Sequence, residues 1–182
     1  DRAIQKYTRQ FDGVILSRRT MSIPAGRIRT LAGECPPKLK PVLKQAIKNV
    51  RAYHRHDGLK SWKFQTPEGM SVGKRVRPLE RVAVYVPGGQ AVYPSTAIMN
   101  IVPAQIAGVR EIHVTMPPGG EGKPDPSIMA VLEMLGIKKL YRIGGAQAIA
   151  AFAYGTESIP RVDKIVGPGN RYVAAAKKLV YG

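Results

Sequence analysis

Three turns marked by glycine carry the residues of this chain that could bind or transform a ligand. They are Pro87-Gly88-Gly89, Gly144-Gly145-Ala146-Gln147 and Gly167-Pro168-Gly169-Asn170. Each follows a short apolar segment and precedes a segment of helical periodicity, which predicts a strand-to-helix turn. Glycine lets a backbone approach a ligand closely, and the free N–H groups at a helix N-terminus attract anions. In a parallel sheet such turns line one crevice at the carboxyl ends of the strands, which predicts a nucleotide-binding site.

The segments around these turns predict a parallel sheet within residues 81–182. Short apolar runs predict strands, and the helix-like segments between them carry end signals, such as Asp125 ahead of Pro126 and Gly136 after the last turn. Strands that alternate with helices form parallel sheets with right-handed crossovers, so the predicted fold class is α/β. The predicted strands are 82–86, 111–115, 140–143 and 164–166, and the predicted helices are 94–107, 126–135, 145–154 and 172–180.

Residues 1–80 have a different pattern, and we interpret them as a lead-in region that is mostly helical with short β pieces. Apolar stripes predict helices over 1–12 and 36–56. The segment 13–35 has the pattern of irregular structure, and 60–80 contains short strand-like pieces that could pair as a hairpin. The predicted domains are therefore 1–80 and 81–182.

The chain is strongly basic, with 29 Lys and Arg against 12 Asp and Glu and a net charge of +17. Such a charge attracts polyanions, but the basic residues are scattered singly through helix-like segments, and no recognisable nucleic-acid module is present. We therefore favour a solvated basic face, or one that docks on an acidic partner surface, over nucleic-acid binding.

Composition also bears on the compartment and on metal chemistry. No apolar run is long enough to span a bilayer, and no signal peptide is visible, so no membrane partner is expected. The single cysteine, Cys35, excludes an internal disulfide and fits a reducing cytoplasm. His54 and His56 lie two residues apart, whereas a helical metal-binding pair needs a spacing of four, so they predict no metal site.

The glycine pattern alone leaves the function open. The dinucleotide fingerprint G-x-G-x-x-G is absent, and no acidic residue ends the second strand to hold a ribose. An α/β domain with tight turns and no nucleotide is the alternative at this point.

Longer runs of sequence are more specific than any glycine pattern. They include the motifs Tyr-Val-Pro-Gly-Gly, Gly-Gly-Ala-Gln-Ala and Gly-Pro-Gly-Asn, each within a longer matching stretch, and Phe11-Asp12-Gly13 near the start. Together these runs closely resemble the histidinol dehydrogenase family, in order over nearly the whole chain and most weakly over 14–60. The stretches are 78–89, 141–151, 154–160 and 162–170.

The resemblance implies a reaction and a set of cofactors. Members of that family oxidise L-histidinol to L-histidine, the last step of histidine biosynthesis, in two NAD-dependent steps through a bound aldehyde. They are zinc-dependent homodimers whose main domains are incomplete Rossmann-like folds. By resemblance, Tyr85, Gln147 and Asn170 contact NAD. The residues alone leave another interpretation open for each: a core aromatic with a bonded hydroxyl for Tyr85, and helix-start residues that satisfy local backbone for Gln147 and Asn170.

The chain also departs from the family. In family members the zinc ligands and the proton-transferring histidine and glutamate follow the Gly-Pro-Gly-Asn helix, whereas this sequence stops at Gly182, directly after that helix. We therefore expect a portion of the enzyme with no catalytic and no metal-binding residue, inactive by itself. The alternatives are a related dehydrogenase of another small alcohol, such as a sulfonated diol, and a non-enzymatic basic module that binds nucleic acid.

Overall fold

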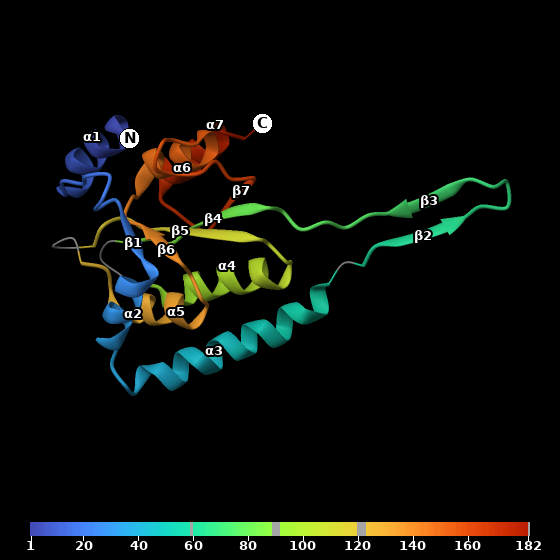
Figure 1. The fold of residues 1–182 in the computed structure, drawn as a ribbon, viewed down its shortest axis with the longest axis horizontal. Coiled ribbons are helices and arrows are strands. Elements are labelled where there is room, and N and C mark those ends of the chain that lie inside the picture. Colours follow the sequence, from blue (N-terminus) through green and yellow to red (C-terminus); the bar gives the residue numbers. More distant parts are fainter. Residues whose placement is uncertain (59, 89–91, 120–122, 182) are drawn as a thin grey trace.

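A five-stranded sheet forms the centre of the computed structural model, which describes residues 1–58, 60–88, 92–119 and 123–181 (Figure 1). Its strands are β1 (Ser22–Pro24), β4 (Arg81–Tyr85), β5 (Glu111–Thr115), β6 (Lys139–Tyr141) and β7 (Lys164–Val166). The order is β1-β6-β5-β4-β7, with β1 antiparallel to β6 and every other pairing parallel. Tyr85 lies opposite Thr115, and Val84 lies opposite Val166, so neighbouring parallel strands end at the same edge.

The parallel strands are added in both directions from β4. The next two strands in sequence, β5 and β6, follow on one side of it, and β7 returns to the other side. Open α/β sheets bind ligands outside the carboxyl ends of their strands, at the point where the strand order reverses. The prediction of an α/β fold with an incomplete Rossmann-like sheet is confirmed, and the order places the reversal at the end of β4.

Helices cover both faces of the sheet (Figure 1). One layer contains α2 (Ala25–Gly33), α3 (Leu39–His54), α4 (Pro94–Ile106) and α5 (Pro126–Met134), and the other contains α1 (Arg2–Asp12), α6 (Gly145–Tyr154) and α7 (Arg171–Leu179). Successive side chains of β4 point to opposite faces of the sheet, so the strand packs against a layer of helices on each face. Val82 and Val84 belong to the apolar cluster of the first layer, and Ala83 and Tyr85 to that of the second. All four side chains are buried, as expected for a strand that is covered on both faces.

Residues 14–35 contain two elements that the sequence analysis misses, β1 and α2. Ile23 of β1 lies opposite Leu140 of β6, and the buried Ile28 and Leu31 belong to α2, which packs against α5. A strand of three residues is too short to show a period, and α2 begins without a side-chain cap. The prediction of irregular structure is therefore wrong here, while the division of domains at 80/81 stays a prediction.

Most other elements lie within a few residues of their predicted bounds. The Asp125 carboxylate accepts the Ser127 N–H at 2.8 Å and caps α5, and Pro103 lies inside α4. The predicted helix over 36–56 is α3, continued by the 3-10 turn η1 (Arg55–Asp57). None of the helices among the described residues is long and apolar enough to cross a membrane.

A hairpin of β2 (Trp62–Gln65) and β3 (Ser71–Lys74) projects away from the sheet (Figure 1). Its strand residues are all exposed, and the Trp62 ring stacks on the Phe64 ring with 6.0 Å between centroids. The predicted hairpin is therefore confirmed, and its apolar side chains face solvent in this chain.

Candidate nucleotide-binding site

Tyr85 ends β4 and lies in the apolar layer beneath α6. Only 3% of the residue is exposed, and its hydroxyl accepts the backbone N–H of Gly145 at 3.1 Å. Burial raises the pKa of Tyr85, the hydrogen bond from Gly145 opposes this rise, and the negative charge of Asp12 adds to it. The hydroxyl therefore stays protonated at neutral pH, and Tyr85 has the contacts of a core aromatic residue at the sheet edge.

The first turn of α6 offers several hydrogen-bonding groups that the chain does not use. Gly145 has φ +64°, and a Cβ there would lie 2.7 Å from Gln147 Oε1, so the missing side chain makes room for the Gln147 carboxamide. The Gln147 side chain makes no hydrogen bond to any residue that the structure describes. The N–H groups of Ala146 and Gln147 also donate to no described residue.

Asn170 caps α7 and is exposed. Its Oδ1 accepts the N–H groups of Tyr172 and Val173 at 3.0 and 3.1 Å. Its Nδ2 makes no hydrogen bond within the described part of the chain. The Oδ1 of Asn170 therefore stabilises the start of α7, and its Nδ2 can donate a hydrogen bond to a ligand.

The sheet brings these three residues to one edge and one layer. β4 and β7 are neighbours, and a Cβ at Gly167 would overlap the Tyr85 carbonyl oxygen, so the third turn lies directly against the end of β4. At Gly144 a Cβ would overlap Pro117. Close packing of the chain on itself is thus one reason for these glycines. The turn after β4 is described as far as Gly88, and Gly89 lies outside the described residues.

Lys177 is a candidate site residue that the sequence analysis misses. Its ammonium donates to the Gly167 carbonyl, and burial lowers its pKa. It lies on α7 seven residues after Asn170, a spacing that places two residues on one face of a helix. The spacing of Asn170 and Lys177 in the sequence is the signal from which Lys177 could have been predicted. A partly buried cation beside this turn favours an anionic ligand.

Two polar residues of α1, Thr8 and Asp12, also belong to this region. Thr8 is fully buried, and Asp12 is close enough to Tyr85 for its charge to raise the pKa of that hydroxyl. Thr8 Oγ1 and Asp12 Oδ2 are both buried, and neither has a hydrogen-bond partner among the described residues. Burial raises the pKa of the Asp12 carboxyl.

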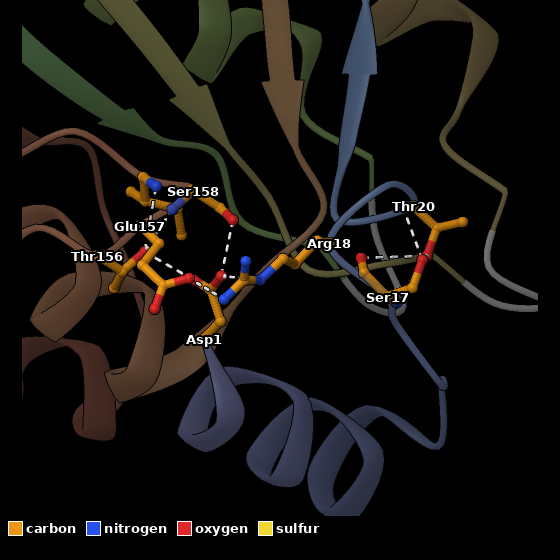
Figure 2. A network of polar contacts seen from close by, with 8 residues as sticks. Asp1, Ser17, Arg18, Thr20, Thr156, Glu157 and Ser158 are labelled. Atoms are coloured by element: carbon orange, nitrogen blue, oxygen red, sulfur yellow. Dashed lines mark hydrogen bonds and ion pairs between the residues drawn. The ribbon is translucent and has the colours of Figure 1, made fainter.

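A polar network holds α1 over the loop that follows α6 (Figure 2). The Asp1 carboxylate accepts the hydroxyls of Thr156 at 2.9 Å and Ser158 at 2.7 Å, and it pairs with Arg18 Nε at 3.0 Å. Arg18 also pairs with Glu157. Between α1 and α6 lies an open apolar groove of about 500 Å³, lined in part by Tyr7, Phe11, Gln147 and Tyr154.

The His, Cys, Asp and Glu residues of the described chain are dispersed. Within residues 1–58, 60–88, 92–119 and 123–181, no group of three or more His, Cys, Asp or Glu could hold a metal ion. His54 pairs with Asp57 at 2.8 Å, and His56 is exposed. His113 lies in the middle of β5, where burial lowers its pKa. His113 lies opposite Ala83 in the middle of β4, and Cys35 is buried.

Comparison with known proteins gives one consistent result. The sequence model of the histidinol dehydrogenase family matches residues 1–182. Histidinol dehydrogenases of Chlorobaculum tepidum and Aquifex aeolicus are 46% and 47% identical over the whole chain, which covers 42% and 41% of them. The crystal structure of histidinol dehydrogenase from Elizabethkingia anophelis superposes with a TM-score of 0.92 at 35% identity, over 99% of this chain and 41% of that one. The chain thus spans about two fifths of the length of these relatives.

Proposed function

The chain belongs to the histidinol dehydrogenase family, and from that premise we propose that it forms the NAD-binding part of an enzyme that oxidises L-histidinol to L-histidine through the aldehyde. The zinc ion and the proton-transferring groups of this reaction belong, in the proposal, to the complete enzyme outside residues 1–182. The complete enzyme is proposed to be a cytoplasmic homodimer.

The observation that carries the proposal is the set of unused donors around the end of β4. The N–H groups of Ala146 and Gln147 point from a helix N-terminus, where a pyrophosphate is favoured. The absence of a Cβ at Gly144 and Gly167 lets these turns pack closely against Pro117 and the end of β4. Lys177 adds a positive charge beside the third turn. These features fit a dinucleotide.

NAD, when bound, supplies the hydride acceptor, and the residues of this chain bind and orient it. The Gln147 carboxamide and the Asn170 Nδ2 donate to the nucleotide from the starts of α6 and α7. Tyr85 acts indirectly, because its hydroxyl accepts the Gly145 N–H and so fixes the start of α6 against β4. We assign no proton transfer to residues 1–182.

Substitution of the two carboxamides in the full-length protein tests the proposal. Gln147→Ala should raise the Kd and the KM for NAD by up to roughly tenfold, the effect of about 0.5–1.5 kcal/mol for one hydrogen bond. The KM for histidinol should change less. Asn170→Asp keeps the oxygen that caps α7 but replaces the donor with a negative charge. It should therefore weaken NAD binding without lowering the melting temperature of the protein.

Gln45→Ala is the matched control, because Gln45 is an exposed glutamine on α3 whose side chain donates a hydrogen bond to Asn49. Unchanged NAD affinity in both site variants would refute the cofactor assignment. NAD binding without histidinol oxidation by the full-length protein would favour a related dehydrogenase of another alcohol.

A further inference from the structure

A cavity lies at the amino-terminal edge of the sheet, where β5 and β6 begin. Its volume is about 500 Å³, which is within the usual range for small-molecule sites. Apolar and charged side chains both line this amino-edge cavity. They include Val109, Ile137, Arg110, Glu111, Lys138 and Lys139. The glycine turns of the candidate nucleotide site follow the opposite ends of the parallel strands, so the two sites are separate.

Hydrogen bonds between helices hold one wall of the amino-edge cavity. Gln105 and Leu135 both line it, and Gln105 Nε2 donates to the Leu135 carbonyl at 2.7 Å. Arg51 of α3 in turn donates to Gln105 Oε1 at 2.9 Å. These bonds join α3, α4 and the end of α5, so the cavity is formed before any ligand binds.

The Tyr141 hydroxyl is a polar group of this cavity that the fold does not use. Tyr141 lines the cavity although only 3% of the residue is exposed, and its hydroxyl makes no hydrogen bond to any residue that the structure describes. Burial and the negative charge of Glu111 raise the pKa of Tyr141, so the hydroxyl is protonated at neutral pH and can donate. The ring packs edge-on against Phe152, with 5.3 Å between centroids. A buried donor without a partner calls for an explanation, and a ligand in the cavity is one.

Two lysines of the amino-edge cavity carry positive charge that the chain does not neutralise. Lys138 and Lys139 line the cavity, and neither has an ion pair within the part of the chain that the structure describes. The Lys139 ammonium lies over the Tyr141 ring, 5.7 Å from its centroid. A positive charge and a hydroxyl donor therefore lie close together, and a negatively charged group is the ligand that both can bind.

The negative charge at this edge is smaller. The helices α4 and α5 both end here, and each helix C-terminus carries about half a negative charge, so together they offset about one of the two lysine charges. Glu111 and Arg110 each have an ion-pair partner, at 3.6 and 3.8 Å. Burial lowers the pKa of His113, which favours its neutral form. The cavity therefore keeps a net positive charge, which favours an anion.

We propose that the amino-edge cavity binds a small organic anion, with a carboxylate or phosphate group on a short apolar body. The Tyr141 hydroxyl and the Lys139 ammonium bind the charged oxygens, and the apolar body packs against Val109 and Ile137. The proposal goes beyond the proposed function and does not depend on it, because the cavity lies at the other edge of the sheet from the nucleotide turns.

Calorimetric titration of the full-length protein with pentanoate and with butyl phosphate tests the proposal. The two probes share an apolar body and differ in the charged group, so the tighter one identifies the group that the cavity prefers. Excess NAD is present throughout, so that the probes do not bind at the nucleotide turns. At least one probe should bind with a Kd on the order of millimolar or lower.

Two substitutions locate the bound probe. Tyr141→Phe removes only the hydroxyl and should weaken probe binding roughly three- to tenfold. Lys139→Gln should weaken it roughly two- to fivefold. The Kd for NAD should stay unchanged in both variants. The melting temperature of Tyr141→Phe should stay unchanged or rise, because the hydroxyl has no partner among the described residues.

Lys44→Gln is the control, because Lys44 is an exposed lysine on α3 and its loss lowers the net charge by the same amount. Failure of both probes to bind would overturn the proposal. Normal probe binding in Tyr141→Phe, with equal weakening in the two lysine variants, would also overturn it, since it would show attraction to the overall charge alone. A raised Kd for NAD in Tyr141→Phe would place the effect at the nucleotide site and overturn the proposal as well.

Discussion

Gly145 is the residue at which two parts of the candidate site meet. Its N–H donates to the Tyr85 hydroxyl, and its missing Cβ leaves the space that Gln147 Oε1 occupies. Gly136, at the end of α5, also has a positive φ, of +69°, but an added Cβ there would meet no atom within 4 Å. The two glycines therefore share a backbone requirement and differ in what surrounds them.

This difference predicts different outcomes for the same substitution. Gly145→Ala and Gly136→Ala should each reduce the free energy of unfolding by about 1–2 kcal/mol, because a side chain is strained in the left-handed region. Only Gly145→Ala should weaken NAD binding, since it displaces the Gln147 carboxamide. Urea unfolding and NAD titration of both variants measure the two effects. An equal loss of NAD affinity in both would show that the effect is one of stability alone.

At the scale of elements, the position of α1 depends on few contacts. The helix packs against α6, and the Asp1 carboxylate ties its first turn to the loop after α6 (Figure 2). Asp1 has a side chain that is only 6% exposed, so its hydrogen bonds are largely shielded from water. These contacts of Asp1 therefore hold the helix that carries Thr8 and Asp12.

Loss of one hydroxyl that bonds to Asp1 should lower the local stability of α1 alone. The Ser158 hydroxyl donates to Asp1 at 2.7 Å. Ser158→Ala should lower the local stability of α1 by about 1.5–3 kcal/mol, the usual range for a hydrogen bond to a charged group. Hydrogen exchange should show faster exchange in α1 and unchanged protection in α5. Ser17→Ala, which removes a hydroxyl that hydrogen-bonds to Thr20, is the control. A uniform loss of protection across the sheet would contradict this.

At the scale of the whole molecule, the chain leaves apolar and unpaired surface exposed. Trp62 is 54% exposed and Phe64 55% exposed on the hairpin, and a two-stranded hairpin is marginally stable by itself. The outer edge of β7 pairs with no strand among the described residues. Such surfaces are usual sites of association, whereas the net charge of +17 opposes it at low salt.

The 182-residue chain produced alone should therefore self-associate at moderate salt. Analytical ultracentrifugation should show a mass that rises with concentration. The double variant Trp62→Ser, Phe64→Ser should shift the equilibrium toward monomer, and Tyr53→Ser, an exposed aromatic on α3, should not. A dilute monomer with a sharp, cooperative melt would contradict this expectation.

The sequence by itself determined most of the second half of the fold. Apolar runs, caps such as Asp125 and glycines at helix ends are local signals, and they predicted the strands and helices of 81–182 within a few residues. They also placed Tyr85, Gln147 and Asn170 at the carboxyl edge, because parallel strands bring their carboxyl ends together. Whether these residues bind NAD stays a prediction.

Only the tertiary structure decided which distant groups lie together. Strand β1 is too short for a period, and its place beside β6 depends on packing with residues far away in the sequence. The approach of Asp12 to Tyr85, and of the Gly167 turn to the end of β4, likewise has no local pattern. A helix-face pattern shows that Thr8 and Asp12 share a side of α1, but only the packing of that helix against the second layer brings Asp12 close to Tyr85.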